Sequence, residues 1–178
     1  FKKNLPNLIK KNFDENIMKS LILKSLKIKK RFIEIDEFDT GPRLILNYGH
    51  TFGHAIEKIT NYSVPHGMAV AHGINMSNFF SLQCKLINKP MFNEIQYQMN
   101  KIVNLSDLRK INVKNFLKII KKDKKNKRNE IRLVLTKGFG KMFIKSFNSD
   151  IKFTSLFSKY IYHIKNLEMN SQYKRSHG

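Results

Sequence analysis

Residues 43–66, RLILNYGHTFGHAIEKITNYSVPH, hold the densest group of chemically active side chains in this sequence. One helix through this stretch, at about 100° per residue, would place five of them within roughly 80° of arc. These are Arg43, Asn47, His50, His54 and Glu57. No lysine falls among them, although lysine is abundant elsewhere in the chain. This polar stripe therefore predicts a functional surface facing a cleft, and His66 lies a short way beyond it.

Start and stop signals divide the chain into helices. Pro42, preceded by Asp39 and Thr40, suits the first turn of a helix that we expect to run to about Ile59. A second helix, apolar on most sides and therefore buried, is expected from Pro65 to about Leu86. Periodic apolar residues predict further helices over residues 5–37 (one or two), 91–103, 113–121 and 150–167. Turn residues between two short apolar runs predict a β-hairpin over about residues 131–146.

The chain length favours a single domain, and the helix signals above predict that it is mainly α-helical. The chain has 178 residues, 41% of them hydrophobic with 14 Phe, which is enough to bury a core. We expect one helical domain over residues 1–170 and a frayed tail at 171–178. One cysteine, Cys84, allows no internal disulfide and favours a reducing compartment, while no apolar run approaches the ~20 residues of a membrane span. The first residue is Phe, and we expect a chain that either was processed or begins inside a longer protein.

The net charge of +21 would by itself predict a polyanionic partner. The distribution weakens that interpretation, because residues 31–84 hold three basic and five acidic side chains whereas residues 85–178 hold 22 basic and six acidic. Asn, Ile and Lys are heavily used and Ala is scarce, a bias typical of an AT-rich genome. That bias explains the charge better than nucleic-acid binding does.

The histidines form a candidate metal site. His50 and His54 have the i, i+4 spacing that can place two ring nitrogens on one metal, but Thr51 stands where the zinc-protease helix has Glu. His50 and His66 are the alternative pair. Nine residues of helix after His50 cover about 13 Å, and the connector at 60–65 can span at most roughly 20 Å, so it can return His66 to His50 unless it forms a tight hairpin. Two imidazoles leave a catalytic zinc site one protein ligand short.

Two segments resemble 3-dehydroquinate synthase and the related sugar phosphate cyclases. They are IEIDEFDTGPRLILNYGHTFGHAIE, residues 33–57, and VPHGMAVAHGINM, residues 64–76. The family pattern is DE…G-R-x-x-L-N-x-G-H-T-x-G-H-A-x-E followed by H-G-E-A-V, and the spacing between its two metal histidines is kept. Weaker similarity extends from SLKIKK to KKDKKNKRNEIRLVL, so the resemblance covers most of the chain.

The resemblance implies the helical C-terminal domain of a two-domain enzyme. In this family an N-terminal α/β domain binds NAD+ and supplies a glutamate zinc ligand, and neither its glycine loop nor that glutamate is found here. His50 and His66 would be the histidine ligands of Zn2+, or of another divalent metal such as Co2+. A homodimer when complete and a cytoplasmic location are further expectations, and the chain alone would be inactive because NAD+ and one ligand come from the other domain.

The implied reaction converts 3-deoxy-D-arabino-heptulosonate 7-phosphate to 3-dehydroquinate in the shikimate pathway. NAD+ oxidises the substrate transiently, phosphate is lost, and the zinc polarises the hydroxyl that is oxidised. By resemblance, Arg43 and Asn47 contact phosphate or carboxylate, and His54 transfers protons. The implied substrate-binding lysines are Lys29 and one of Lys124 and Lys125.

Met68 is the plainest departure from the pattern, which usually has Glu after His-Gly. A thioether can neither orient a metal ligand nor receive a proton. This position therefore favours two alternatives to the named reaction: a divergent cyclase with another sugar phosphate as substrate, and an inactive homologue. A basic nucleic-acid-binding module is the remote alternative.

Overall fold

The computed structural model describes residues 14–104, 108, 111–122 and 130–176. The chain divides between Asn47 and Tyr48 into two compact units, which we call the N-terminal unit and the core unit. Each unit is described by itself. The expectation of one domain over residues 1–170 stays a prediction.

The described residues of the N-terminal unit form helix α2 (Glu15–Ile35) and the 3-10 helix η1 (Pro42–Asn47). α2 begins at Asp14, whose side chain accepts a hydrogen bond from the backbone nitrogen of Asn16 at 2.8 Å. After α2 the carboxylate of Asp36 accepts hydrogen bonds from the backbone nitrogens of Thr40, Gly41 and Arg43, at 3.0, 2.8 and 3.0 Å. These bonds satisfy donors at the start of η1 that a helix terminus leaves unpaired, and so they fix the turn between the two helices.

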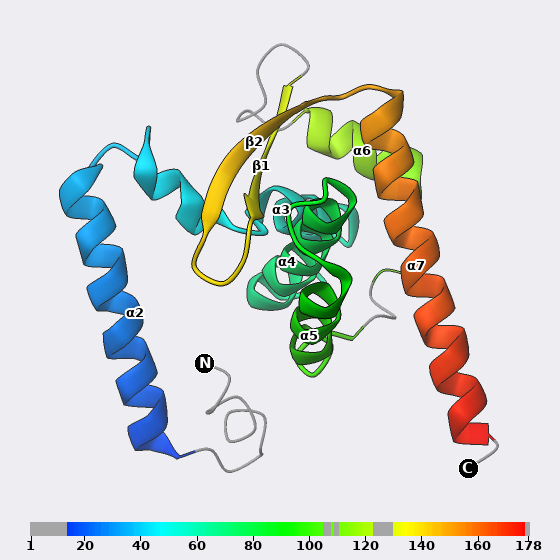
Figure 1. Cartoon of the computed structure of the whole chain (residues 1–178), viewed down its shortest axis with the longest axis horizontal. Helices are drawn as coiled ribbons and strands as arrows, with labels where there is room; N and C mark the ends of the chain where they lie inside the picture. Colours follow the sequence, from blue (N-terminus) through cyan, green and yellow to red (C-terminus); the bar gives the residue numbers. More distant parts are fainter. Residues whose placement is uncertain (1–13, 105–107, 109–110, 123–129, 177–178) are drawn as a thin grey trace. The chain divides into compact units, whose positions relative to one another are not determined.

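The core unit is built around one buried helix, α4 (Figure 1). Its described residues form α3 (His50–Ile59), α4 (His66–Gln83), α5 (Lys89–Met99), α6 (Val113–Lys121), β1 (Glu130–Thr136), β2 (Met142–Asn148) and α7 (Ile151–Ser176). α4 contacts α3, α5, β1 and α7, and α3 also contacts α6. The two strands form an antiparallel hairpin in which Glu130 pairs with Asn148 and Thr136 with Met142.

Aromatic side chains fill the core of this unit. Phe52 of α3 and Phe80 of α4 are fully buried, with ring centroids 5.3 Å apart, and Phe153 of α7 lies 5.3 Å from Phe80. Phe116 of α6 stacks on Phe157 of α7 at 4.5 Å. Offset and tilted aromatic contacts of this kind add to the free energy of burial. The prediction that α4 would be a buried, largely apolar helix is confirmed.

Two glycines allow α3 and α4 to approach at backbone distance. Gly49, at the start of α3, has a left-handed φ of +80°, and a Cβ on Gly73 of α4 would lie 2.0 Å from the Gly49 carbonyl oxygen. No side chain fits in that space, and the conformation of Gly49 is one that other residues rarely adopt. This contact sets the position of the first residue of α3, His50.

The predicted single helix over residues 42–59 is wrong. A 3-10 helix ends at Asn47, the chain breaks at Tyr48 and Gly49, and α3 starts at His50. The left-handed Gly49 interrupts the helix because its carbonyl packs against Gly73. The polar stripe is therefore not one helix face, since only its last three members share α3.

The remaining element predictions agree with the structure within a few residues for α4, α5, α6 and the hairpin. α7 is longer than predicted, because it continues through Ser176 where the sequence predicted a helix end at 167 and a frayed tail from 171. Among the described residues, no helix combines the length and the apolar character that crossing a bilayer requires.

Candidate functional site

Three imidazole rings converge in the core unit. His50 and His54 lie one turn apart on α3 with ring centroids 5.5 Å apart, and His66, the first residue of α4, lies 5.5 Å from His50 and 6.0 Å from His54. Both pairings that the sequence left open, His50 with His54 and His50 with His66, are therefore close in space. The structure meets the condition on which the second pairing depended, since the connector returns to α3.

The connector between α3 and α4 turns the chain through two consecutive left-handed residues. Asn61 and Tyr62 have φ values of +50° and +60°, and the backbone nitrogen of Tyr62 donates to the carbonyl oxygen of Glu57 at 2.7 Å. Asn adopts this conformation readily, whereas for Tyr it costs about 1 to 2 kcal/mol. The turn directs the chain back along α3 and delivers His66 to the side of the other two histidines.

The resemblance assigns two histidines to the metal, and in each of them one ring nitrogen faces a hydrogen-bond acceptor. The Nδ1 atom of His66 lies 3.0 Å from Oε1 of Glu57, and Nδ1 of His50 lies 3.3 Å from the carbonyl oxygen of Tyr48. A neutral imidazole that donates from Nδ1 keeps the lone pair of Nε2 for a metal. Both rings are therefore held in a form suited to metal binding through Nε2.

The donor atoms suit a borderline divalent cation. Ligand atoms of His54, Glu57 and His66 all lie within 4.8 Å of one another. Imidazole nitrogens are ligands that zinc and cobalt commonly take in proteins. The residues present therefore fit such a metal. In the sequence, Glu57 belongs to the polar stripe and has no predicted role; its spacing of three residues from His54 and seven from His50 indicates that it shares their face.

Tyr48 anchors the base of the site to α4. Its hydroxyl donates a hydrogen bond to Oδ1 of Asn78, and burial raises the pKa of this phenol well above its usual value, so it stays protonated. The backbone carbonyl of the same residue faces His50. The position of the His50 ring therefore depends on a contact between α4 and the segment just before α3.

Met68 lies in the first turn of α4 and packs, half buried, against the main hydrophobic core. The position at which the family pattern has Glu therefore contributes to core packing in this chain. The carboxylate that reaches His66 comes from Glu57, a position at which the family pattern also has Glu.

None of the predicted substrate-binding residues is a described residue of the core unit. Lys29 is exposed on α2, and Asn47 is half buried at the end of η1. Arg43 donates from Nη1 to the carbonyl oxygen of Glu37 at 2.8 Å. These residues belong to the N-terminal unit, and their contacts with substrate stay predictions. The two late lysines, Lys124 and Lys125, lie outside the described residues.

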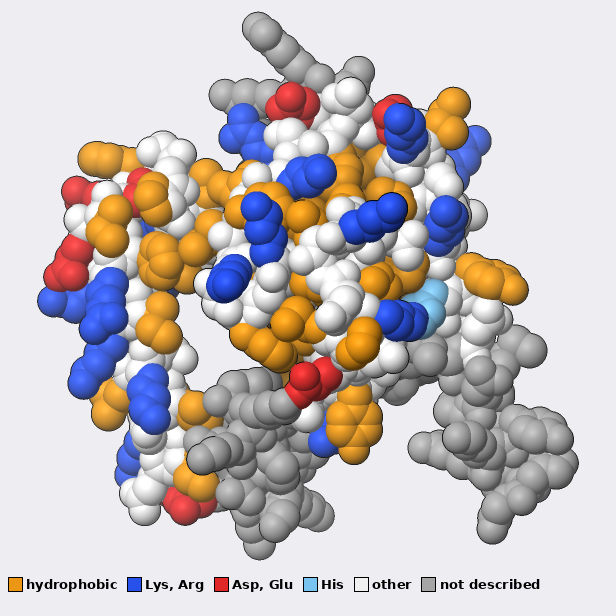
Figure 2. Space-filling model, in the orientation of Figure 1, with side chains coloured by type: hydrophobic (Ala, Val, Ile, Leu, Met, Phe, Trp, Pro, Cys, Tyr) orange, Lys and Arg blue, Asp and Glu red, His pale blue; other side chains and the backbone are white. Residues whose placement is uncertain are grey.

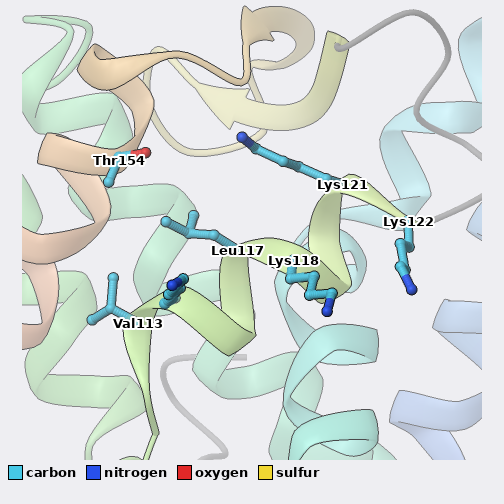
Figure 3. A pocket seen from close by; sticks show the side chains of 7 residues that line it. Val113, Leu117, Lys118, Lys121, Lys122 and Thr154 are labelled. Carbon is cyan, nitrogen blue, oxygen red and sulfur yellow. The ribbon is translucent and has the colours of Figure 1, made fainter.

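A separate cavity of about 670 Å³ opens beside α6 (Figure 3). Val113 and Leu117 supply its apolar lining, and Thr154 of α7 borders it. The lysines that line it are Lys114, Lys118, Lys121 and Lys122. None of the described candidate residues lines this cavity, so it is distinct from the histidine cluster.

Comparisons with known proteins agree with these motifs. The family model described as 3-dehydroquinate synthase C-terminal matches residues 1–126. The 3-dehydroquinate synthase of Campylobacter jejuni (strain 81-176) is 37% identical over 133 residues, which cover 74% of this chain and 38% of that protein. The 3-dehydroquinate synthase of Pelagibacter ubique is 39% identical over 129 residues, which cover 69% of this chain and 35% of that protein. The chain thus spans about two fifths of the length of these relatives.

Solved structures support the fold. A crystal structure of 2-deoxy-scyllo-inosose synthase superposes with a TM-score of 0.55 at 20% identity, covering 68% of this chain and 34% of that one. A second crystal structure of 2-deoxy-scyllo-inosose synthase, complexed with carbaglucose-6-phosphate, NAD+ and Co2+, superposes with a TM-score of 0.53 at 22% identity. This match covers 70% of this chain and 34% of that one. The sequence match and the fold therefore agree, and the chain belongs to the 3-dehydroquinate synthase C-terminal family.

Proposed function

We propose that this chain is the metal-binding C-terminal part of a 3-dehydroquinate synthase. The proposed reaction is the phosphate-eliminating cyclisation of 3-deoxy-D-arabino-heptulosonate 7-phosphate to 3-dehydroquinate. The observation that carries the proposal is the convergence of His50, His54 and His66 across the α3–α4 connector, in a chain that belongs to this family. A 3-dehydroquinate synthase is also what the curated relatives at 37% to 39% identity are named.

Each histidine has a distinct proposed role. His50 and His66 hold a divalent metal, zinc in this proposal, through Nε2, because their Nδ1 atoms face acceptors. When bound, the metal polarises the substrate hydroxyl that is oxidised and lowers its pKa. His54, one turn from His50, is placed to accept or donate a proton beside the metal.

The anionic groups of the substrate are assigned to the positively charged and amide side chains. Arg43 supplies a planar guanidinium suited to phosphate or carboxylate, and Asn47 supplies an amide donor. Lys29 and one of Lys124 and Lys125 complete the proposed contacts. The third metal ligand and the NAD+ site are assigned to an N-terminal domain, and a homodimer and a cytoplasmic location belong to the same proposal.

Metal content and turnover, measured together, test these roles. In the protein that joins this chain to its NAD+-binding domain, His50→Ala and His66→Ala are expected to lose both bound zinc and activity. His54→Ala serves as the matched control, because it should retain zinc and lose turnover by about 10²- to 10⁴-fold. Unchanged zinc content in the first two variants would refute the ligand assignment. The 178-residue chain alone should show no turnover with NAD+ and zinc.

A divergent cyclase acting on another sugar phosphate is the second candidate, and Met68 is the observation that favours it. Its side chain belongs to the hydrophobic core, so this chain lacks the carboxylate that the family pattern has there. Comparing kcat/KM for the heptulosonate phosphate with that for other sugar phosphates distinguishes the two. Loss of turnover with all of them, with zinc retained, would favour an inactive homologue.

The nucleic-acid alternative predicts a continuous basic surface. On the face of the core unit that Figure 2 shows, the Lys and Arg side chains are separated by hydrophobic and uncharged ones. On this face the scattered charges of the described residues form no continuous track for a phosphate backbone (Figure 2). Binding to duplex DNA that falls steeply with added salt would support the alternative.

A further inference from the structure

Glu57 makes a close polar contact within the histidine cluster. Its Oε1 atom lies 3.0 Å from Nδ1 of His66, and its side chain is only 13% exposed, compared with 58% for the side chain of His66. The carboxylate is therefore the sheltered partner that holds a more exposed ring. It comes from the last turn of α3, on the side from which His50 and His54 project.

The distance identifies this contact as a hydrogen bond. At 3.0 Å, Nδ1 of His66 and Oε1 of Glu57 match an N–H···O hydrogen bond. When the His66 ring is neutral, this contact places its proton on Nδ1 and leaves the lone pair of Nε2 for a metal.

The backbone of Glu57 also stabilises the connector that leads to His66. Its carbonyl oxygen accepts a hydrogen bond from the backbone nitrogen of Tyr62 at 2.7 Å. Glu57 thus holds the connector through its main chain and the histidine after the connector through its side chain. Substituting the side chain leaves the main-chain bond in place, so the two contributions can be separated by experiment.

We propose that Glu57 is a positioning residue for the metal: its carboxylate fixes the tautomer and orientation of His66 so that Nε2 binds the ion. This inference rests on the function proposed above. It also assigns to Glu57 the carboxylate support that Met68 cannot give, since the Met68 side chain packs into the core. Acceptors of this kind contribute about 10- to 100-fold to metal affinity.

Cobalt binding tests the inference with a readout other than activity. In the protein joined to its NAD+-binding domain, Co2+ is titrated and followed by its visible absorption. Glu57→Gln keeps an acceptor oxygen without the charge, and is expected to weaken binding by about 10-fold; Glu57→Ala removes the acceptor and is expected to weaken it by up to about 100-fold. The shape of the cobalt spectrum should not change, because Glu57 is not a ligand.

Glu130→Gln is the matched control. It makes the same change of charge in the core unit at an exposed residue of β1 whose carboxylate lies 3.5 Å from the hydroxyl of Ser146, and it should bind Co2+ as the unmodified protein does. A direct reading comes from the 15N chemical shifts of His66 in the metal-free protein. Protonation at Nδ1 should dominate, and it should be lost in Glu57→Ala and partly restored in Glu57→Gln.

The outcomes separate the inference from the function beneath it. Unchanged cobalt affinity in Glu57→Ala, or a changed spectrum in Glu57→Gln, would overturn the positioning role while leaving a metal site. Failure of the unmodified protein to bind Co2+ at all would overturn the proposed function, and the positioning role with it.

Discussion

Gly73→Ala is expected to destabilise the core unit by separating α3 from α4. The added Cβ would lie 2.0 Å from the carbonyl oxygen of Gly49 and 2.9 Å from the backbone nitrogen of Gly53. An ordinary contact between carbon and a carbonyl oxygen is about 3.3 Å, so the two helices must move apart by roughly 1 Å. Both sides of the clash are backbone, and no flexible side chain can turn away to relieve it.

The loss of folding free energy in Gly73→Ala follows from that geometry. Overpacking in a core costs about 1 to 3 kcal/mol when side chains can adjust, so a clash between two backbones should cost at least about 3 kcal/mol. For a chain of this length, each kcal/mol lowers the melting temperature by about 2 to 4 °C, which gives a fall of about 6 to 12 °C. Because His50 directly follows Gly49, the affinity for Co2+ should fall as well.

Thermal unfolding followed by circular dichroism measures this effect, and Gly67→Ala is the control. Gly67 is also in α4, but a Cβ there would meet no heavy atom within 4 Å. Its replacement should leave stability unchanged or raise it by up to about 1 kcal/mol, since Ala favours a helix. A melting temperature for Gly73→Ala within about 2 °C of the unmodified chain would refute the reasoning.

Two predictions concern pH. The hydrogen bond from the backbone of Thr40, together with that from Gly41, holds the pKa of Asp36 below its usual value, although burial opposes this shift. The stability that Asp36 gives to the turn is therefore fully present above the pKa of Asp36 in the unfolded chain. It is lost as the pH falls through the lower pKa of Asp36 in the folded chain. The amide NMR signals of Thr40 and Gly41 should therefore shift only below about pH 4, and a midpoint above that would contradict the assignment. Burial, together with the charge of Lys89, lowers the pKa of His163, so the unfolded chain takes up the proton first. The free energy of unfolding should fall as pH is lowered from about 7 to 5, less steeply in His163→Gln; equal slopes would contradict this.

Local sequence patterns were sufficient to predict most of the described helices and strands of the core unit. α6 has the bounds that its apolar period predicts, and the hairpin β1–β2 surrounds the predicted turn. Helix period, capping residues and turn residues act over a few positions, so they can be read without knowledge of the fold. The motif at residues 43–66 similarly predicted the family and the histidines that come together.

The break in the polar stripe could not be predicted in this way. Residues 43–57 satisfy the period of a single helix, and Gly49 within it is compatible with a helix. The break arises because the carbonyl of Gly49 packs against Gly73, a residue of another helix. A contact between residues distant in sequence thus outweighed the local preference.

The sequence by itself determined the helical elements, the family and the set of imidazoles available to a metal, because each depends on residue type and short spacing. Tertiary structure decided which of these side chains meet. The connector returns His66 to α3 through left-handed Asn61 and Tyr62, a conformation for which Tyr has no local preference. The pairing of Glu57 with His66 therefore depends on that turn and on the packing of α4 against α3.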